Sequence, residues 1–292
     1  MTHLIGLDYA SVDENETPNF GLVKQAGARF AILRAIYGRR VQGQRDSSPV
    51  YLDPVWARDK DAIAEAGLKR TAYLFVCYPR NGFDTPPPEV QAQAFIAYVQ
   101  LERNKDFVPI LDVEEESDAI SPSEMHDWTL RVCKRLCDHY GAWPGIYTSA
   151  RVWRDNLQDH AAGELLECPL WLAKPWPWAA RVAVNLDGAP NYSPATIPQF
   201  GDETNYWLYQ YQGDAINWPG LDSTADASRF HVIARGMKGT IVRWIQRRVG
   251  AFVDGDFGPD TETAVKTFQI KHGLTADGIV GPLTFAPLSW VR

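Results

Sequence analysis

FVPILDVEEE, residues 107–116, ends an apolar run with two carboxylates, Asp112 and Glu114. On a β-strand, residues two positions apart point to the same face and lie ~7 Å from one another. The carboxyl ends of the strands in a parallel α/β barrel open into the cavity where catalytic side chains gather. The segment therefore predicts a buried strand that carries two acids to the mouth of one pocket.

Two carboxylates held this close repel each other, and repulsion together with partial burial raises the pKa of one of them. A carboxyl group that keeps its proton near neutral pH can protonate the leaving oxygen of a glycosidic bond. The other interpretation is a solvated acidic strand end, because Glu115, Glu116 and Asp118 follow. The pattern alone leaves both interpretations open.

Outward from this segment, apolar strand-like runs alternate with helical stretches over the first 230 residues. This alternation indicates parallel strands with helical crossovers, and the number of strands favours a closed ring over an open sheet. The expected fold class is α/β, an irregular TIM-like β/α barrel followed by a small all-α module, with loops as the last crossovers. The expected strands are 4–9, 29–38, 70–78, 107–115, 143–149, 168–173 and 206–212, and the expected helices are 56–66, 89–103 and 123–140.

Two further acids fall where barrel strands are expected to end. Asp8 closes the first strand, LIGLD, and Asp226 lies in TADASRF, after the last strand, where the chain returns to close the ring. Acids at the carboxyl ends of strands one, four and eight would converge on one pocket. A helix cap is the other interpretation of Asp8, and Asp222 competes with Asp226 for the converging position.

Aromatic residues gather at the same strand ends. Sugars offer flat C–H faces that stack on aromatic rings, and their hydroxyls suit polar side chains such as Gln210. A single aromatic residue in a strand is more often part of the core than a platform for a ligand, so these residues count only as a group. The group consists of Tyr9, Tyr37, Tyr73, Tyr147, Trp171, Tyr209 and Tyr211.

The net charge of −7 is shared unevenly: residues 236–292 are close to +2 and the first 235 close to −9. An acidic main part argues against nucleic acid as a partner, while a mildly basic tail would favour an anionic cell envelope. No apolar run approaches the ~18 residues that span a bilayer, so membrane insertion is not expected. The start, MTHLIGLDYASVDENE, lacks the pattern of a secretion signal, and synthesis in a cytoplasm is expected.

The four cysteines form no CxxC pattern, and the six histidines are scattered singly. The cysteines are expected to be small buried apolar residues in a reducing compartment. Metal sites in proteins are built from grouped His, Cys or carboxylate ligands. No metal or organic cofactor is therefore expected.

The tail repeats a turn-and-helix pattern. VDGDFGPDTETAV (253–265) and ADGIVGPLTFAPL (276–288) share D-G-x-x-G-P-x-T at a spacing of 23 residues. The first Gly suits a left-handed turn, and the second Gly with Pro predicts a helix start capped by the Thr. VKTFQIKHGL, between the two copies, predicts a helix that Gly273 closes.

These motifs resemble glycoside hydrolase family 25, the lysozymes that cleave peptidoglycan, over nearly all of residues 4–230. GLDYAS is similar to the family's opening strand, FAILRAIYG to its second, and ILDVEEE to its D-x-E strand. The resemblance implies a barrel of eight strands and about five helices, in a domain expected over residues 1–232. It also implies an N-acetylmuramidase in which Glu114 is the general acid, Asp112 and Asp8 support the transition state, and Asp226 positions the substrate.

The sequence departs from the family pattern at the pocket wall. The family's third-strand His is replaced by Leu74, and its Lys-Ala-x-Glu-Gly becomes Arg34-Ala35-Ile36-Tyr37-Gly38. Arg34 and Tyr37 are therefore candidates for substrate contacts of this chain's own. The added segment RRVQGQRDSSPV (39–50) predicts a polar loop near the mouth.

The tail, expected as a domain over residues 236–292, resembles the peptidoglycan-binding helical module of cell-wall hydrolases. The resemblance implies bacterial peptidoglycan as the partner, and the chain is expected to be a monomer. The combination of domains looks like a phage endolysin, made in the host cytoplasm and acting on the wall or periplasm after release. A secreted antibacterial effector and a non-catalytic wall-binding protein are the alternatives.

Two other enzyme classes compete with this interpretation. A zinc amidase or peptidase also carries such tails, but it needs grouped His or Cys ligands. A chitinase-like barrel also places an acid on its fourth strand, normally with further aspartates upstream, where this chain has Val108-Pro109-Ile110. Both features favour the muramidase.

Overall fold

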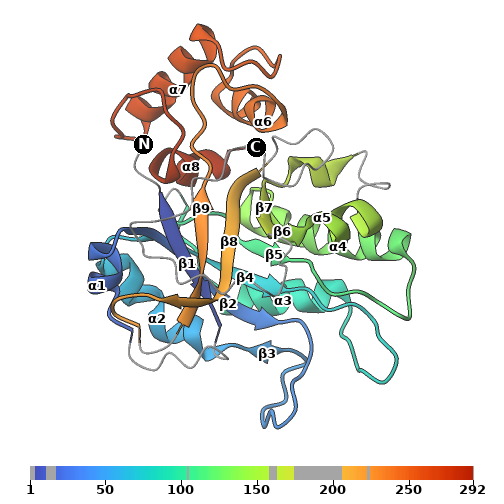
Figure 1. Ribbon diagram of the computed structural model, residues 1–292. Helices are drawn as coiled ribbons and strands as arrows, with labels where there is room; N and C mark the ends of the chain where they lie inside the picture. The colour runs from blue at the N-terminus through green and yellow to red at the C-terminus, as the bar shows by residue number, and fades with distance from the viewer. Residues whose placement is uncertain are drawn as a thin grey trace.

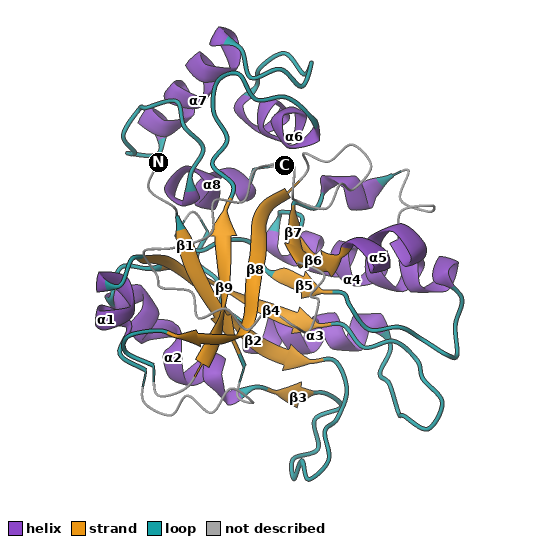
Figure 2. Ribbon diagram, viewed as in Figure 1, coloured by secondary structure: helices purple, strands orange, loops and turns teal. Residues whose placement is uncertain are grey.

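The structure, a computed structural model, describes residues 4–10, 18–103, 105–157, 163–173, 206–221 and 224–291. Within these residues, eight strands pair in a ring in the order β1, β2, β4, β5, β6, β7, β8, β9 and back to β1 (Figures 1 and 2). The predicted α/β barrel is thus confirmed. The ring strands are β1 (Ile5–Tyr9), β2 (Ala28–Tyr37), β4 (Lys69–Phe75), β5 (Ile110–Asp112), β6 (Gly145–Ser149), β7 (Leu170–Ala173), β8 (Tyr206–Asn217) and β9 (Thr224–Phe230), and β3 (Tyr51–Leu52) pairs outside the ring with β2.

Helices pack on the outer face of the ring, where α1, α2 and α3 contact β2 and where α2 and α3 also contact β4 (Figure 1). The longest of those described, α4, starts at a capping box in which Ser121 and Glu124 satisfy each other's backbone N–H groups, and it ends at Gly141 with φ 74°. The expected helix 89–103 already ends at Tyr98, because Val99 adopts an extended conformation. The barrel helices are α1 (Phe20–Gln25), α2 (Pro54–Glu65), α3 (Pro88–Tyr98), α4 (Pro122–Tyr140) and α5 (Ala150–Val152), followed by the π-helix η2 (Trp153–Leu157) and the 3-10 helix η4 (Glu164–Glu167).

Closure of the ring differs from the expectation. Strand β9 runs antiparallel to both β8 and β1, whereas parallel pairing was expected throughout. A short connection joins β8 to β9, and a connection of that length cannot hold the crossover that a parallel pair requires. Asp226 therefore lies inside the closing strand, directly opposite Asp8, and not after the last strand.

Strand β5 is shorter than expected, Ile110–Asp112 instead of 107–115. Pro109 has no N–H to donate to a neighbouring strand, so regular pairing is interrupted there, although Phe107 donates to the carbonyl of Arg70 at 3.0 Å and Pro109 accepts from Gly145 at 2.9 Å. Val113, the first residue beyond the strand, still donates to the carbonyl of Tyr147 at 2.8 Å, and Glu114 follows it. The predicted acid pair is thus split between a strand end, Asp112, and the loop that leaves it.

Successive side chains along a strand point alternately to the helices outside the ring and to its interior, where the site lies. Leu111 packs in the cluster that faces the helices, while Ile110 belongs to the cluster inside the ring. Gly6 makes room inside the ring, because a Cβ atom there would lie 2.3 Å from the ring of Phe30. All four cysteines are buried and form no disulfide, in agreement with the expectation of buried apolar residues. In the described part of the chain, none of the helices has the length and apolar character needed to cross a membrane.

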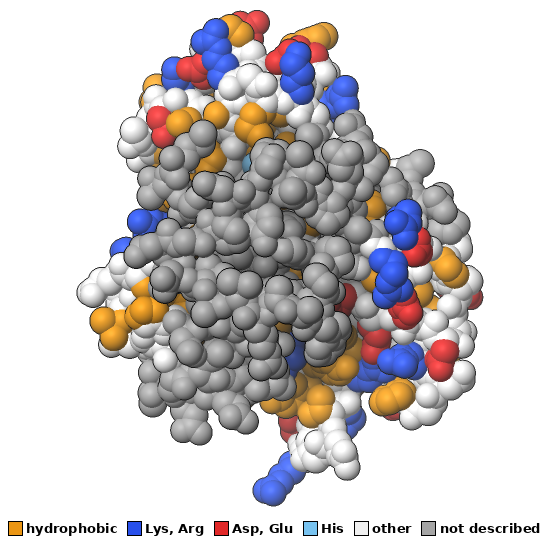
Figure 3. Space-filling model, in the orientation of Figure 1, with side chains coloured by type: hydrophobic (Ala, Val, Ile, Leu, Met, Phe, Trp, Pro, Cys, Tyr) orange, Lys and Arg blue, Asp and Glu red, His pale blue; other side chains and the backbone are white. Residues whose placement is uncertain are grey.

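The tail forms three helices, α6 (Thr240–Val249), α7 (Pro259–Lys271) and α8 (Pro282–Ser289), within the described residues. The predicted left-handed turns are present at Gly255 and Gly278, with φ of 80° and 77°. The expected Thr caps are wrong: Gly258 and Gly281 occupy the N-cap positions and make no side-chain cap bond. On the face drawn in Figure 3, basic and acidic side chains are interspersed over the tail.

The Thr hydroxyls instead contact two buried glutamines, Gln246 and Gln269, whose role the sequence did not reveal. The Nε2 of each donates to the repeat's Asp at 2.7 Å, to a backbone carbonyl at 3.0 Å and to the Thr oxygen at 3.0 Å. Each Oε1 accepts from the turn glycine's N–H, at 2.8 Å and 2.9 Å. The repeat is therefore longer than the quoted motif, since each glutamine stands eight residues before its Asp.

Replacing Gln269 with Leu is expected to lower the free energy of unfolding by about 2 kcal/mol or more, because buried polar groups lose their partner. Urea denaturation followed by tryptophan fluorescence measures this change. The control is Ile270→Ala at the next position, which is 68% exposed and should change stability by less than about 0.5 kcal/mol. Equal effects of the two substitutions would contradict the assigned role of Gln269.

The tail packs against the amino-terminal end of the barrel (Figure 1). Phe285 of α8 is fully buried and stacks on Trp207 of β8, with ring centres 4.3 Å apart. Trp290 donates its Nε1 hydrogen to the carbonyl of Asp106 at 2.8 Å, and Arg103 donates to the carbonyl of Trp290 at 2.8 Å. The α8 helix thus forms the floor of the barrel, at the end opposite to Asp112.

Candidate active site

The carboxylates predicted from separate strands meet at the carboxyl-terminal end of the ring. Asp8 and Asp112 are each 6% exposed, and Asp226 is partly buried. The charges of Glu114, Asp8 and Asp226 all raise the pKa of Asp112, so these three acids lie close enough to act on it. The expected convergence of acids from strands one, four and eight therefore has a structural basis.

Gln210 of β8 connects these acids. Its Nε2 donates to Asp8 Oδ1 at 3.1 Å and to Asp226 Oδ2 at 2.8 Å. Its Oε1 accepts from the hydroxyl of Tyr147 at 2.6 Å. An amide that bridges two carboxylates offsets part of their repulsion without adding charge, so it holds the acids in place and keeps the site anionic.

A second chain of hydrogen bonds fixes Asp8 from the side. The indole N–H of Trp171 donates to Ser228 Oγ at 3.0 Å, and Ser228 Oγ donates to Asp8 Oδ2 at 3.4 Å. Trp171 is 2% exposed and lies 4.6 Å from the ring of Tyr147, centre to centre. Trp171, expected as a sugar platform, therefore lies beneath the pocket and supports an acid.

Asp112 is the most confined of the acids. Its Oδ1 has no hydrogen-bond partner among the described residues. Burial raises the pKa of Asp112 well above its usual range, the negative charges of Glu114 and Asp8 raise it further, and the guanidinium of Arg34 lowers it. A buried carboxyl with an unbonded oxygen and a raised pKa is typical of a functional site.

Glu114 lies at the rim of the same pocket. Its side chain reaches solvent, yet the surrounding atoms raise its pKa above the ordinary value of a glutamate by desolvation. Its charge also raises the pKa of Asp112 and of Tyr147, so it is close to both. Glu114 is thus the acid that an external ligand can reach, while Asp112 lies deeper.

Tyr73 and Arg34 complete the wall near Asp112. Burial raises the pKa of Tyr73 well above its usual range, and the charges of Asp112 and Asp8 act on it in the same direction. Arg34 is held by Asp53, with 2.8 Å between Nε and Oδ2. Arg34 is therefore a cation fixed next to the acids.

Two other predicted aromatics lie away from the acids. The ring of Tyr37 stacks on Phe75 at 4.9 Å, close to Arg39. Tyr9 donates to Asp59 of α2 at 2.5 Å, on the helix side of β1. Tyr9 therefore belongs to the contact between barrel and helix.

Some candidates are not described. The backbone of Tyr209 pairs with Leu172 of β7, but the side chains of Tyr209 and Tyr211 lie outside the described residues. Asp222, the competitor of Asp226, also lies outside them, as do the expected loop crossovers between β7 and β8. Among the residues that the structure does describe, none of the groups of three or more His, Cys, Asp or Glu is arranged to hold a metal ion.

The site includes residues that the sequence did not single out. Ser228 was missed because a serine in a strand carries no distinctive signal. Glu115 was interpreted only as part of an acidic strand end, but it is nearly buried and pairs with arginines. The run of three glutamates could have indicated this, because only one of three consecutive side chains can face the pocket and the other two need different partners.

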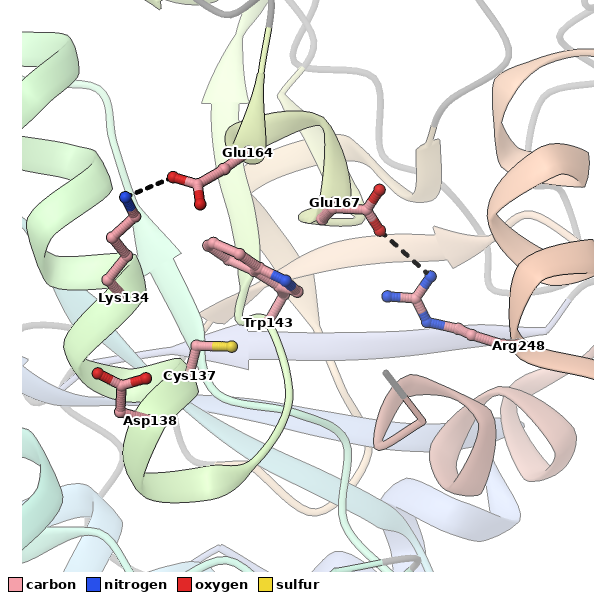
Figure 4. A pocket seen from close by; sticks show the side chains of 7 residues that line it. All are labelled: Lys134, Cys137, Asp138, Trp143, Glu164, Glu167 and Arg248. Carbon is pink, nitrogen blue, oxygen red and sulfur yellow. Dashed lines mark ion pairs between the residues drawn. The ribbon is translucent and has the colours of Figure 1, made fainter.

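A separate cavity of about 370 Å³ lies between the barrel and the tail (Figure 4), and the residues that line it include none of the four acids. Its cations already have partners: Lys134 pairs with Glu164, and Arg248 of α6 lies 3.8 Å from Glu167. Trp143 and Cys137 contribute its apolar surface. The cavity thus belongs to the contact between the two parts of the chain.

Two family models match separate stretches of the chain. The sequence model of glycosyl hydrolases family 25 matches residues 7–215, which is most of the chain. The model of a peptidoglycan binding domain matches residues 238–288.

Solved structures with a similar fold include a lysozyme and the catalytic domain of an endolysin. The bacterial lysozyme from Streptomyces coelicolor has a TM-score of 0.58 and 21% identity, over 78% of this chain and 92% of that chain. The catalytic domain of endolysin ply40 from bacteriophage P40 of Listeria monocytogenes has a TM-score of 0.54 and 16% identity, over 78% and 93%. Likeness at these identities establishes the barrel fold.

Curated proteins match over a shorter stretch. Zinc D-Ala-D-Ala carboxypeptidase of Streptomyces albus G is 44% identical over 61 residues, which is 18% of this chain and 24% of that protein. The chain spans between 18% and 36% of the length of the curated relatives that it matches.

Proposed function

Because the chain belongs to glycosyl hydrolases family 25, we propose that it cleaves the β-1,4 bond between N-acetylmuramic acid and N-acetylglucosamine, with Glu114 as the general acid. The protein is a glycoside hydrolase of the lysozyme type that carries a peptidoglycan binding domain. The observation that carries the proposal is the position of Glu114: an acid with a raised pKa, open to ligands, at the rim of a ring of carboxylates.

The proposed reaction uses the difference in depth between the two acids. Glu114 transfers its proton to the glycosidic oxygen, and the bond from that oxygen to the anomeric carbon breaks. Water supplies the hydroxyl that the carbon gains, and the other proton of that water restores the protonated acid. Asp112 and Asp8 stabilise the positive charge that develops on the sugar, directly or through the substrate's acetamido group. Asp226, held by Gln210, orients the sugar.

The remaining pocket residues supply substrate contacts in this proposal. Tyr147 and Gln210 present a hydroxyl and an amide beside the acids, and Tyr73 and Arg34 form the adjoining wall. The tail would hold the enzyme on peptidoglycan while the barrel cuts.

We also propose that the protein is a phage endolysin, made in a host cytoplasm and active on the wall after release. The joining of a lysozyme barrel to a peptidoglycan binding domain supports this role, and so does the fold shared with the ply40 catalytic domain. The test is expression in a bacterium with and without an agent that permeabilises the membrane from outside. Lysis only on permeabilisation supports the endolysin, whereas activity in the medium of intact cells supports a secreted effector.

Mass spectrometry of fragments from purified peptidoglycan tests the bond specificity. A muramidase leaves N-acetylmuramic acid at the new reducing end. N-acetylglucosamine at that end, or free peptides with intact glycan, would each overturn the proposal and name another bond. A digest of chitin run in parallel separates the muramidase from a chitinase-like enzyme.

Asp112→Asn is expected to move the alkaline limb of the activity profile to lower pH. The limb marks the pH at which the pair Glu114 and Asp112 loses its last proton, and repulsion between the two carboxylates delays that loss, as the effect of Glu114 on the pKa of Asp112 indicates. With Asn at position 112, the remaining carboxyl group ionises without that repulsion, so the limb moves to lower pH. Initial rates on soluble peptidoglycan fragments from pH 4 to 8 measure the shift, and a limb that stays in place or rises would contradict the coupling.

A further inference from the structure

The three consecutive glutamates after β5 point to three different environments. Glu114 lies at the pocket rim, and Glu116 pairs at the surface with Arg151, where its side chain is 54% exposed. Glu115, between them, has a side chain that is only 9% exposed. A carboxylate so little exposed must be paired to remain charged.

Glu115 contacts two other segments at the mouth of the barrel, those that follow β2 and β4. Its Oε1 pairs with Arg39, just after β2, and lies 3.5 Å from Nη1 of Arg80 in the loop after β4. Its Oε2 accepts from the backbone N–H of Tyr78 at 3.2 Å. One side chain therefore fixes the Glu114 loop to the segments that follow β2 and β4.

Arg39 is built into this contact. It is 3% exposed, and its guanidinium lies 4.9 Å from the ring centre of Phe83 and 5.9 Å from that of Tyr37. Its Nε and Nη1 have no hydrogen-bond partner among the described residues. Burial raises the pKa of the neighbouring Cys77 thiol to about 12, so Cys77 stays neutral and Glu115 provides the balancing charge.

The backbone hydrogen bonds of β5 do not extend to Glu114. The side-chain contacts of Glu115 therefore matter more for the position of Glu114. Val113 makes the segment's last described backbone bond to β6, and the next residue is the proposed acid. Two contacts further along join the same segments: Ser117 donates to the carbonyl of Pro79, and Asp118 accepts from the backbone of Asn81 at 3.0 Å. The position of Glu114 thus depends on the residue that follows it.

We propose that Glu115 is a positioning residue, which holds the backbone of Glu114 at the pocket rim through its contacts with Arg39, Arg80 and Tyr78. The proposal rests on the function proposed for Glu114. A general acid must lie within hydrogen-bond reach of the leaving oxygen, so a loosened loop lowers the rate of proton transfer. Binding of the glycan, which uses the rest of the pocket and the tail, is affected far less.

Glu115→Gln is expected to lower kcat at least 10-fold on soluble peptidoglycan fragments, with KM changed less than 2-fold. The matched control is Glu116→Gln, which removes a surface pair one residue away and should leave both constants within 2-fold. All variants are assayed well below their measured melting midpoints, so that unfolded protein does not reduce the rate. A kcat for Glu115→Gln within 2-fold of that of the control would overturn the proposal.

The double variant Glu115→Gln with Arg39→Met separates positioning from folding. It leaves no buried guanidinium without a partner, so the melting midpoint should recover toward that of the wild type. The kcat should stay low, because the contact that holds the loop is still absent. Recovery of kcat together with stability would overturn the proposal, while an inactive wild type would instead refute the function proposed for Glu114.

Discussion

Glu114→Gln is expected to reduce hydrolysis of peptidoglycan by about 10³-fold, within the range of 10²–10⁴ that a positioned general acid contributes. The amide has nearly the shape of the carboxyl group but holds no proton that it can give to the leaving oxygen. Since Glu114 lies at the rim and reaches solvent, its replacement leaves the core unchanged. The loss should therefore fall on catalysis and not on folding.

Three measurements make this result decisive. Release of reducing ends from purified peptidoglycan gives the rate, co-sedimentation with intact walls gives binding, and the melting midpoint gives stability. Only the first should change in Glu114→Gln, and none should change in Glu116→Gln. A Glu114→Gln protein that clears walls at near the wild-type rate would remove Glu114 from its role and with it the mechanism proposed above.

Phe285→Ala is expected to lower the free energy of unfolding by about 3–5 kcal/mol, the cost of deleting a buried aromatic ring. The ring stacks on Trp207 of the barrel at 4.3 Å and on Trp244 of α6 at 5.2 Å. It also meets Phe230 edge-on at 5.6 Å. The cavity would thus open between barrel and tail, and both should lose stability together.

Urea denaturation monitored by tryptophan fluorescence tests this prediction, because Trp207 and Trp244 report from opposite sides of the contact. The control is Leu283→Ala, on the same helix but 62% exposed, with an expected change below about 0.5 kcal/mol. A barrel transition that keeps its wild-type midpoint in Phe285→Ala would show that the two parts unfold independently.

The sequence predicted the ring of strands and the meeting of its acids because both follow from local patterns. Runs of apolar residues indicate the strands. An acid at the carboxyl end of such a run lies at the same end of the barrel as the others. The antiparallel direction of β9 was not predictable in this way, because direction depends on the connection between strands. Asp226 was placed in the right region for a partly wrong reason.

Side-chain partners required the structure. Nothing in a strand such as YWLYQYQ indicates that Gln210 will bridge Asp8 and Asp226, since the two acids are 202 and 16 residues away. The burial of Trp171 was likewise not predictable. An inward-facing aromatic residue can stack on a sugar near the mouth of the barrel or support an acid deeper inside, and the sequence does not give its depth. The bonds of the tail glutamines to the turns were missed because the repeat was defined from the turn onward and not from the helix before it.

The aromatic residues that close the base of the barrel also limit how such proteins can exchange domains by recombination. A tail attached through a linker could be swapped for another by recombination at any point of that linker. Here Phe285 and Trp290 complete the packing of the catalytic part. A crossover upstream of α8 would therefore produce a barrel whose amino-terminal end is exposed to solvent. Hybrid enzymes from this lineage should survive only where the incoming module brings matching rings.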